Sequence, residues 1–274
     1  NKLLNLSLYQ RVDFMKSKLA ALIIFAFSIA NGAKYAGEFL NIGAGARALG
    51  MGGAFCAVAD DASAGYWNPS GLFLINGQEA QFMHSERFGG IVMYDYLGYG
   101  RSDGSTGLGA SLFRTDVGDI ANTNDLSYYD TGSDGVFGVD GTGEPGDAGD
   151  EGYAPGTPPS RPEGNGEWDP GEEIIYDEGS ITYGSGVDWA LYLSYSRKLN
   201  SVFSVGASVK VIRRGLMDHS AFGLGLDIGA RYQPSEAVYI GLNLQDVPVT
   251  QLFWDTGSNE SILPTVKLGL AVKW

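Results

Sequence analysis

Residues 203–232 read FSVGASVKVIRRGLMDHSAFGLGLDIGARY, and this stretch decides the fold. Apolar residues occupy every second position: Phe203, Val205, Ala207, Val209, Val211, then Phe222, Leu224, Leu226, Ile228, Ala230 and Tyr232. The positions between them hold Ser204, Gly206, Ser208, Lys210, then Gly223, Gly225, Asp227, Gly229 and Arg231. Successive side chains of a β-strand point to opposite faces. The stretch therefore predicts two strands, each with an apolar face and a polar or glycine-rich face.

The same alternation continues on both sides of this stretch. It predicts about eight strands, near residues 78–84, 90–100, 105–114, 186–198, 202–212, 221–232, 237–246 and 264–274. Runs of about ten residues match a tilted strand that spans a membrane. A soluble β-sandwich alternates in the same way, so the pattern alone does not decide between the two.

Three further features favour a transmembrane antiparallel β-barrel of the outer membrane. Aromatic residues lie near the ends of the apolar faces, namely Trp189, Tyr195, Phe203, Phe222, Tyr232 and Trp274. The opposite face carries charged residues that suit a wet or salt-bridged lumen, namely Lys210, Asp227, Arg231 and Lys267. Short turns, such as Asn200-Ser201, alternate with long loops, such as residues 247–263 and 125–178, which places the C-terminus in the periplasm and the long loops outside the cell.

The charge of the chain is concentrated in one segment. The 274 residues carry a net charge of −14, and residues 125–178 hold 15 acidic residues and one basic residue. The remainder is balanced, with 17 acidic and 17 basic residues. We expect this segment to be a long acidic extracellular loop. An acid excess of this size argues against a nucleic-acid partner, and one cysteine excludes an internal disulfide.

Within the acidic loop, oxygen-bearing side chains alternate around a glycine-rich turn. The candidate calcium ligands are Glu163, Asn165, Glu167, Asp169, Glu172 and Asp177, with a second candidate set at Asp130, Asp134 and Asp140. Ca²⁺ takes six to eight oxygen ligands, and this spacing can supply them. The competing interpretation is a solvated acidic loop without a metal. Apart from this Ca²⁺, no cofactor is expected.

The chain opens with features of a secretory signal peptide. Met15 begins a segment with Lys16 and Lys18, an apolar run of 11 residues from Leu19 to Ile29, and small residues up to Ala33. The run is shorter than the roughly 20 residues of a membrane-spanning helix, which is the alternative interpretation. We therefore expect export to the outer membrane, with three regions: residues 1–33 with the signal peptide, an N-terminal plug or first-strand motif at 34–77, and a barrel at 78–274.

Residues 36–74 read AGEFLNIGAGARALGMGGAFCAVADDASAGYWNPSGLFL. This stretch resembles the N-terminal signature of the PorV/PorQ family, outer-membrane barrels of the wider FadL-like (long-chain fatty-acid transporter) superfamily. The motif positions are Arg47, Gly50, Gly52, Gly53, Asp60, Asp61, Trp67, Asn68, Pro69 and Gly71. Ser70 stands where the family usually has Ala.

The resemblance implies a barrel of about fourteen strands, more than the eight or nine visible here, which favours truncation over a complete eight-stranded barrel. It also implies a non-enzymatic role in type IX secretion. Such barrels receive exported cargo proteins through a C-terminal signal domain and pass them to a surface attachment complex. Two alternatives stay open: a FadL-like channel for a hydrophobic small molecule, and a structural, calcium-stabilised surface barrel. All three have outer-membrane lipid as a partner.

The residues of the motif permit two structural interpretations. Glycines between Arg47 and Ala59 allow close backbone approach. In Asn68-Pro69-Ser70-Gly71 we expect Asn68 to cap, Pro69 to fix φ and Gly71 to adopt a positive φ. The motif either shapes the first strand and its entry, or forms a plug that gates or lines a lateral route for a ligand.

Other motifs carry little chemistry. Gly43 to Ala48 fits a loose dinucleotide fingerprint, but the glycines that follow oppose the helix that this fingerprint requires. His84 and His219 are far apart, and a single cysteine completes no zinc spacing. Asp218-His219-Ser220 are sequence neighbours on an expected loop, whereas catalytic relays are assembled in space. We do not expect an enzyme.

Overall fold

The computed structural model describes residues 36–122, 128–130, 151–153, 174–176, 179 and 181–273. The chain divides into two compact units, residues 1–117 with 186–274, and residues 118–185. The first unit contains almost all of the described structure. Each unit is described by itself below.

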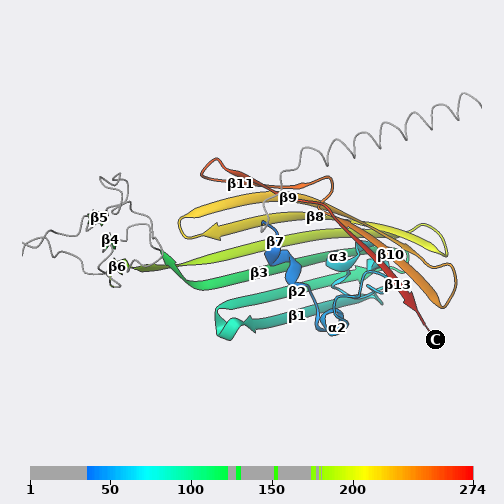
Figure 1. Ribbon diagram of the computed structural model, residues 1–274. Helices are drawn as coiled ribbons and strands as arrows, with labels where there is room; N and C mark the ends of the chain where they lie inside the picture. Colours follow the sequence, from blue (N-terminus) through cyan, green and yellow to red (C-terminus); the bar gives the residue numbers. More distant parts are fainter. Residues whose placement is uncertain are drawn as a thin grey trace, which may run out of the picture. The chain divides into compact units, whose positions relative to one another are not determined.

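The first unit is built on a curled antiparallel sheet, a half-barrel (Figure 1). Its strands are β1 (Gln78–Arg87), β2 (Val92–Ser102), β3 (Thr106–Asn122), β7 (Thr182–Lys198), β8 (Phe203–Leu216), β9 (His219–Tyr232), β10 (Val238–Gln245) and β13 (Thr265–Val272). They follow one another in this order across the sheet. The predicted antiparallel all-β fold is confirmed, with strand positions close to those expected.

A hairpin extends this sheet beside β9. It consists of β11 (Thr250–Trp254) and β12 (Asn259–Ile262), and β11 also pairs with β9. Residues 247–263 were expected to be a loop, because strands this short show no sustained alternation. The turn of the hairpin is held by Asp255, whose carboxylate accepts from Ser220 N at 2.7 Å. This bond, together with His219, keeps the pKa of Asp255 below its ordinary value.

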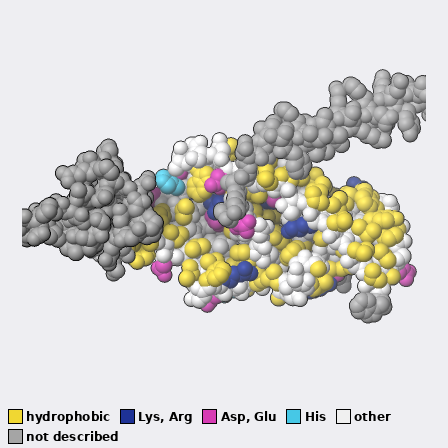
Figure 2. Space-filling view, in the orientation of Figure 1, with side chains coloured by type: hydrophobic (Ala, Val, Ile, Leu, Met, Phe, Trp, Pro, Cys, Tyr) yellow, Lys and Arg dark blue, Asp and Glu magenta, His cyan; other side chains and the backbone are white. Residues whose placement is uncertain are grey.

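The two faces of the sheet differ sharply in polarity. On the outer face, the side chains of Leu193, Val209, Leu224 and Leu268 are exposed. On the inner face, Ser194, Ser208, Asp227 and Asn243 are buried. Figure 2 shows hydrophobic side chains spread over much of the visible surface of the described residues, with charged groups in small separate spots. From β7 to β13 the apolar side of the sheet is thus mainly the side left uncovered, whereas on β1–β3 the uncovered side also carries the ion-paired His84, Asp95 and Arg114.

Residues 36–77, called here the N-terminal segment, cover the inner face. They form short helices joined by turns: η1 (Glu38–Ile42), α2 (Ala46–Gly50), α3 (Ala64–Trp67) and η2 (Pro69–Leu74). A further short helix, η3 (Phe88–Gly90), joins β1 to β2. Glycines with positive φ follow several of these helices, including Gly43, Gly52 and Gly53. A single core forms where this segment meets the sheet, and it contains Phe55, Tyr66, Trp67, Leu72, Tyr96, Phe113 and Tyr192.

The described part of the second unit contains a small sheet of β4 (Tyr128–Asp130), β5 (Glu151–Tyr153) and β6 (Ile174–Tyr176), in the order β5-β4-β6. Most of the acidic segment 125–178 lies outside the described residues, as do the expected signal peptide and Trp274. Among the helices of the described part of the chain, none is long and apolar enough to cross a membrane.

Candidate functional site

The inner face of the sheet binds the N-terminal segment by donating hydrogen bonds to its backbone carbonyls. The pairs are Tyr94 Oη to Gly43 O (2.8 Å), Tyr96 Oη to Ala62 O (3.1 Å), Ser102 Oγ to Phe73 O (2.7 Å), Ser204 Oγ to Ser70 O (3.1 Å), Ser208 Oγ to Gly65 O (2.7 Å), Asn243 Nδ2 to Trp67 O (3.0 Å) and Gln245 Nε2 to Tyr66 O (3.1 Å). The donors come from β2, β8 and β10. Irregular backbone that is buried needs such partners for its carbonyls. The polar inner face therefore serves as a binding surface for the chain's own N-terminal segment.

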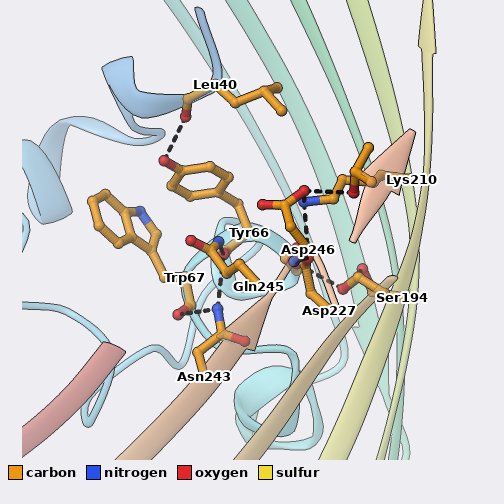
Figure 3. Close-up of polar contacts among 12 residues, drawn as sticks. Leu40, Tyr66, Trp67, Ser194, Lys210, Asp227, Asn243, Gln245 and Asp246 are labelled. Atoms are coloured by element: carbon orange, nitrogen blue, oxygen red, sulfur yellow. Dashed lines mark hydrogen bonds and ion pairs between the residues drawn. The ribbon is translucent and has the colours of Figure 1, made fainter. Parts of the chain in front are cut away.

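Two aromatic residues of the N-terminal segment, Tyr66 and Trp67, lie at the centre of this contact (Figure 3). Tyr66 Oη donates to Leu40 O at 2.6 Å, and Trp67 Nε1 donates to Ala44 O at 2.7 Å. The Tyr66 ring packs edge-on against Trp67 at 5.0 Å and lies 6.1 Å from the ring of Tyr192. Burial raises the pKa of Tyr66 far above its ordinary value. These contacts tie the start of the N-terminal segment to its middle and to β7.

The Asn68-Pro69-Ser70-Gly71 turn agrees with the expectation except at Gly71. Asn68 caps η2, because its Oδ1 accepts from Ser70 N at 3.2 Å, and its Nδ2 also donates to Cys56 O and Ala230 O. The expected positive φ at Gly71 is wrong, since Gly71 is not among the residues with positive φ. Gly71 is instead required by close approach, because a Cβ there would lie 1.8 Å from Ala59 O.

The other motif residues make contacts and turns within the N-terminal segment. Arg47 forms an ion pair with Asp60, and this contact raises the pKa of Arg47. Asp61 accepts hydrogen bonds from the backbone and hydroxyl of Ser63, at 2.9 and 2.6 Å. Gly50, Gly52 and Gly53 lie in and after α2, and Gly52 and Gly53 have φ of 63° and 78°. These residues shape the N-terminal segment itself rather than its contact with the strands.

A buried charge cluster lies beside Tyr66 (Figure 3). Lys210 Nζ is 2.8 Å from Asp227 Oδ1 and 2.7 Å from Asp246 Oδ1, and the Lys210 side chain is 1% exposed. Asp246 N donates to Asp227 Oδ1 at 2.8 Å, and Thr250 Oγ1 donates to Asp246 Oδ1 at 2.6 Å. Buried charges persist when they are paired and hydrogen-bonded in this way. The cluster links β8 and β9 to the loop that follows β10.

The remaining predicted lumen residues lie apart from this cluster. Lys267 Nζ lies 5.1 Å from the ring centre of Tyr66 and 5.4 Å from that of Trp67, so its charge faces two aromatic rings. Arg231 is near the end of β9, with its guanidinium carbon 4.7 Å from the ring centre of Tyr239. The predicted wet or salt-bridged lumen is thus, where described, a surface packed against the N-terminal segment with one ion-paired cluster.

Two cavities lie at opposite ends of the inner face. One, of about 250 Å³, is lined by Glu38, Asn41, Tyr66, Tyr192, Lys210, Gln245, Asp246 and Thr265, among others. The other, of about 640 Å³, is lined by Arg47, Val58, Asp60, Leu74, Arg231, Gln233, Tyr239, Ala271, Val272 and Lys273. Along β10 they lie near Gln245 and Tyr239 respectively, about 20 Å apart. Residues of the N-terminal segment, including Asn68, lie between them.

The predicted calcium ligands cannot be located in this way. Glu163, Asn165, Glu167, Asp169, Glu172 and Asp177 lie outside the described residues, as do Asp134 and Asp140 and the side chain of Asp130. Within the described residues, no group of histidine, cysteine or acidic side chains is arranged to hold a metal ion. The calcium hypothesis stays a prediction. His219 contacts Asp255 at 3.2 Å.

The sequence patterns did not indicate several residues of this site. Tyr66 and Asp246 are central to it, but neither belongs to a strand with alternation. Tyr192 does lie on the polar side of the β7 alternation, opposite Leu191 and Leu193. A large aromatic residue among serines on an otherwise polar face was the available signal that this face is packed rather than open.

Comparison with known proteins adds one match. No curated protein matches the chain. Residues 21–131 match the profile of a family described as "Uncharacterised protein family (UPF0164)". The match covers the N-terminal segment and the first strands of the sheet, and over this part the chain is similar to that family.

Proposed function

We propose that this protein is a non-enzymatic β-barrel of the outer membrane, with the N-terminal segment as an internal plug. The supporting observation is the exposed apolar face of the sheet: from β7 to β13, apolar side chains such as Leu268, 76% exposed, cover most of the outer face, while Lys210 and Asp227 are buried on the inner face. A soluble protein rarely exposes so large an apolar face. In membrane barrels, the apolar side chains face outward in this way and the bilayer covers them.

The spacing of aromatic residues supports this proposal. Register places Trp189 and Phe222 opposite the same residue of β8, Arg213, and it pairs Phe203 with Tyr232. Because a strand rises about 3.3 Å per residue, Phe222 and Tyr232 are about 33 Å apart along β9. At a strand tilt of ~40°, this corresponds to about 25 Å along the membrane normal, the height of the apolar band of such barrels.

The proposal also requires that the sheet be closed. β1 and β13 are the edge strands of the described sheet. Lipid-exposed sheet edges are not tolerated, because their backbone groups find no partner in the bilayer. In a closed barrel, β1 and β13 would have to be paired, either with each other or with further strands.

For the role of the barrel, we propose binding of exported cargo proteins in type IX secretion. The proposal rests on the PorV/PorQ resemblance of residues 36–74. It is supported by the packing of the inner face, because Asn243 and Gln245 bind the N-terminal segment and separate cavities lie at its two ends. A channel for a hydrophobic molecule would need a continuous apolar path along the inner face, which the N-terminal segment covers where it is described. We therefore place cargo contacts on the acidic segment 125–178 and on the β11–β12 hairpin.

A retention experiment tests this role. The full chain, in detergent micelles, is immobilised and offered a reporter with or without the C-terminal signal domain of an exported protein. The matched variant replaces residues 125–178, which belong to the second compact unit, with a short glycine-serine turn. We expect retention only of the reporter with the domain, and weaker retention by the variant. Equal retention of both reporters would contradict the role, and co-purification of a hydrophobic molecule without a protein partner would favour a channel.

A further inference from the structure

The larger cavity, at the end of the inner face where β9 turns into β10 and where β13 ends, has an excess of positive charge. Arg47, Arg231 and Lys273 line it, and Asp60 is the acidic residue in its lining. Asp60 is already ion-paired with Arg47, and Asp61 Oδ2, outside the lining, lies 3.8 Å from Arg47 Nη1. The lining therefore carries a net charge of about +2, unlike the Lys210 cluster, in which two aspartates surround one lysine.

Arg231 is the most buried of these three positively charged residues. Its side chain points inward, and the residue is only 9% exposed. Its Nη1 donates to Gln233 Oε1 at 3.4 Å, while its Nε has no hydrogen-bond partner among the described residues. A buried guanidinium with an unused donor is costly unless a ligand or partner satisfies it.

Comparison with Arg214, another inward-facing arginine of the described sheet, shows what Arg231 lacks. Arg214 Nε and Nη2 donate to the two carboxylate oxygens of Asp188, at 3.0 and 3.2 Å. For Arg231, no carboxylate of the described residues lies within ion-pair distance. The Arg231 guanidinium group thus contacts Gln233 and the ring of Tyr239, and it lines the larger cavity.

We propose that this cavity binds a phosphate group, with Arg231 as its main ligand and Lys273 and Arg47 as additional positive charges. An arginine guanidinium binds two oxygens of a phosphate at once, and a phosphate group with one or two negative charges offsets the net positive charge of the lining. Val58, Leu74 and Val272 lie beside the cations, so the group fits either as inorganic phosphate or as the headgroup of a phospholipid. The inference requires only the folded first unit and does not depend on the proposed role in secretion.

Titration calorimetry of the full chain in phosphate-free detergent micelles tests the site. One arm uses inorganic phosphate, a second uses dihexanoyl phosphatidylglycerol below its own micelle concentration, and a third uses butyrate. The variants are Arg231→Gln and the exposed Lys273→Gln. Arg213→Gln is the matched control, because Arg213 is an exposed arginine near the far end of β8. Near-UV circular dichroism checks that each variant is folded.

We expect saturable binding in at least one phosphate arm, and the arm that binds identifies the source. Arg231→Gln should weaken this binding by about tenfold or more, since a hydrogen bond to a charged group is lost. Lys273→Gln should weaken it by about threefold, as expected for an exposed charge, and Arg213→Gln should leave it unchanged. Absence of binding in both phosphate arms, equal binding of butyrate, or unaltered binding in folded Lys273→Gln and Arg231→Gln would overturn the inference.

Discussion

At the scale of single residues, Lys210 shows how a charged side chain is accommodated inside the sheet. Asp227 and Asp246 both contact its ammonium group, and Asp227 Oδ2 has no hydrogen-bond partner among the described residues. Removal of the lysine would leave two carboxylates buried without a counter-charge. The cluster therefore contributes more to specifying the arrangement of β8, β9 and the loop after β10 than to net stability.

The Lys210→Met variant tests this cluster. We expect it to lower the free energy of unfolding by about 3–5 kcal/mol, the cost of breaking a buried ion pair. Combining it with Asp227→Asn and Asp246→Asn should recover part of the loss. The control is Lys198→Met, at an exposed position of β7, with an expected change within about 0.5 kcal/mol. Denaturant unfolding in detergent micelles measures all three, and equal loss in both single variants would contradict the account.

Gly71 provides a second test, because its role is close approach rather than backbone conformation. A Cβ at Gly71 would lie 1.8 Å from Ala59 O, a backbone atom that cannot move aside easily. Gly71→Ala should therefore lower the free energy of unfolding by about 3 kcal/mol, at the upper end for overpacking. At Gly50, where a Cβ would meet nothing within 4 Å, Gly50→Ala should be neutral or slightly stabilising. The same unfolding assay compares them, and a neutral Gly71→Ala would show that the segment is loosely held.

Ionisation of the buried Cys56 thiol should make the free energy of unfolding depend on pH in the alkaline range. Its Sγ donates to Lys267 O at 3.5 Å, and burial raises the pKa of its thiol to about 11. Because the folded state holds this proton more tightly than the unfolded state, its stabilising effect is complete below about pH 9 and is lost as pH rises towards 11. Between pH 8 and pH 10, the native protein should lose about 1 kcal/mol more stability than Cys56→Ala. Parallel pH profiles in the two proteins would contradict this assignment.

At the scale of elements, η2 depends on one side chain. Asn68 caps it through Ser70 N and also binds the carbonyls of Cys56 and Ala230, so it connects the N-terminal segment to itself and to β9. Asn68→Ala should cost about 2 kcal/mol or more, from the cap and the unpaired carbonyls together. Asn200, which accepts from Val202 N and Phe203 N in an exposed turn, is the control, and Asn200→Ala should cost about 1 kcal/mol. Equal losses in the unfolding assay would assign no special role to Asn68.

The elements also show which parts of the fold follow from local sequence. The strands β8 and β9 were predictable because their alternation is sustained over more than ten residues. The hairpin β11–β12 was not, because strands of 5 and 4 residues are too short to establish a period. β3 extends to Asn122, beyond its expected end at 114, where Asp116, Gly118 and Asp119 interrupt the apolar pattern.

The candidate site was predictable only in part, for a related reason. Lys210 and Asp227 could be placed on one face because both lie in alternating strands, whereas their partner Asp246 lies in a loop. The turn at Asn68 was recognisable from its residue types. The close approach at Gly71 was not, because it depends on Ala59, twelve positions away in the sequence. Contacts between an irregular segment and a sheet leave no periodic signal.

At the scale of the whole molecule, insertion into a membrane depends on one property, the apolar outer face of the first unit. Environment-sensitive fluorescence tests it directly. The full chain with Cys56→Ala is folded into phospholipid vesicles after a single cysteine is introduced by Leu193→Cys, Val209→Cys or Leu268→Cys, all at exposed outer-face positions. Each cysteine carries the same fluorophore, and Ser201→Cys, in the turn between β7 and β8, is the control. The account predicts blue-shifted emission, quenched by lipids spin-labelled on their acyl chains, at the three outer-face positions and not at position 201. Emission at those positions that iodide in water quenches as strongly as at position 201 would contradict it.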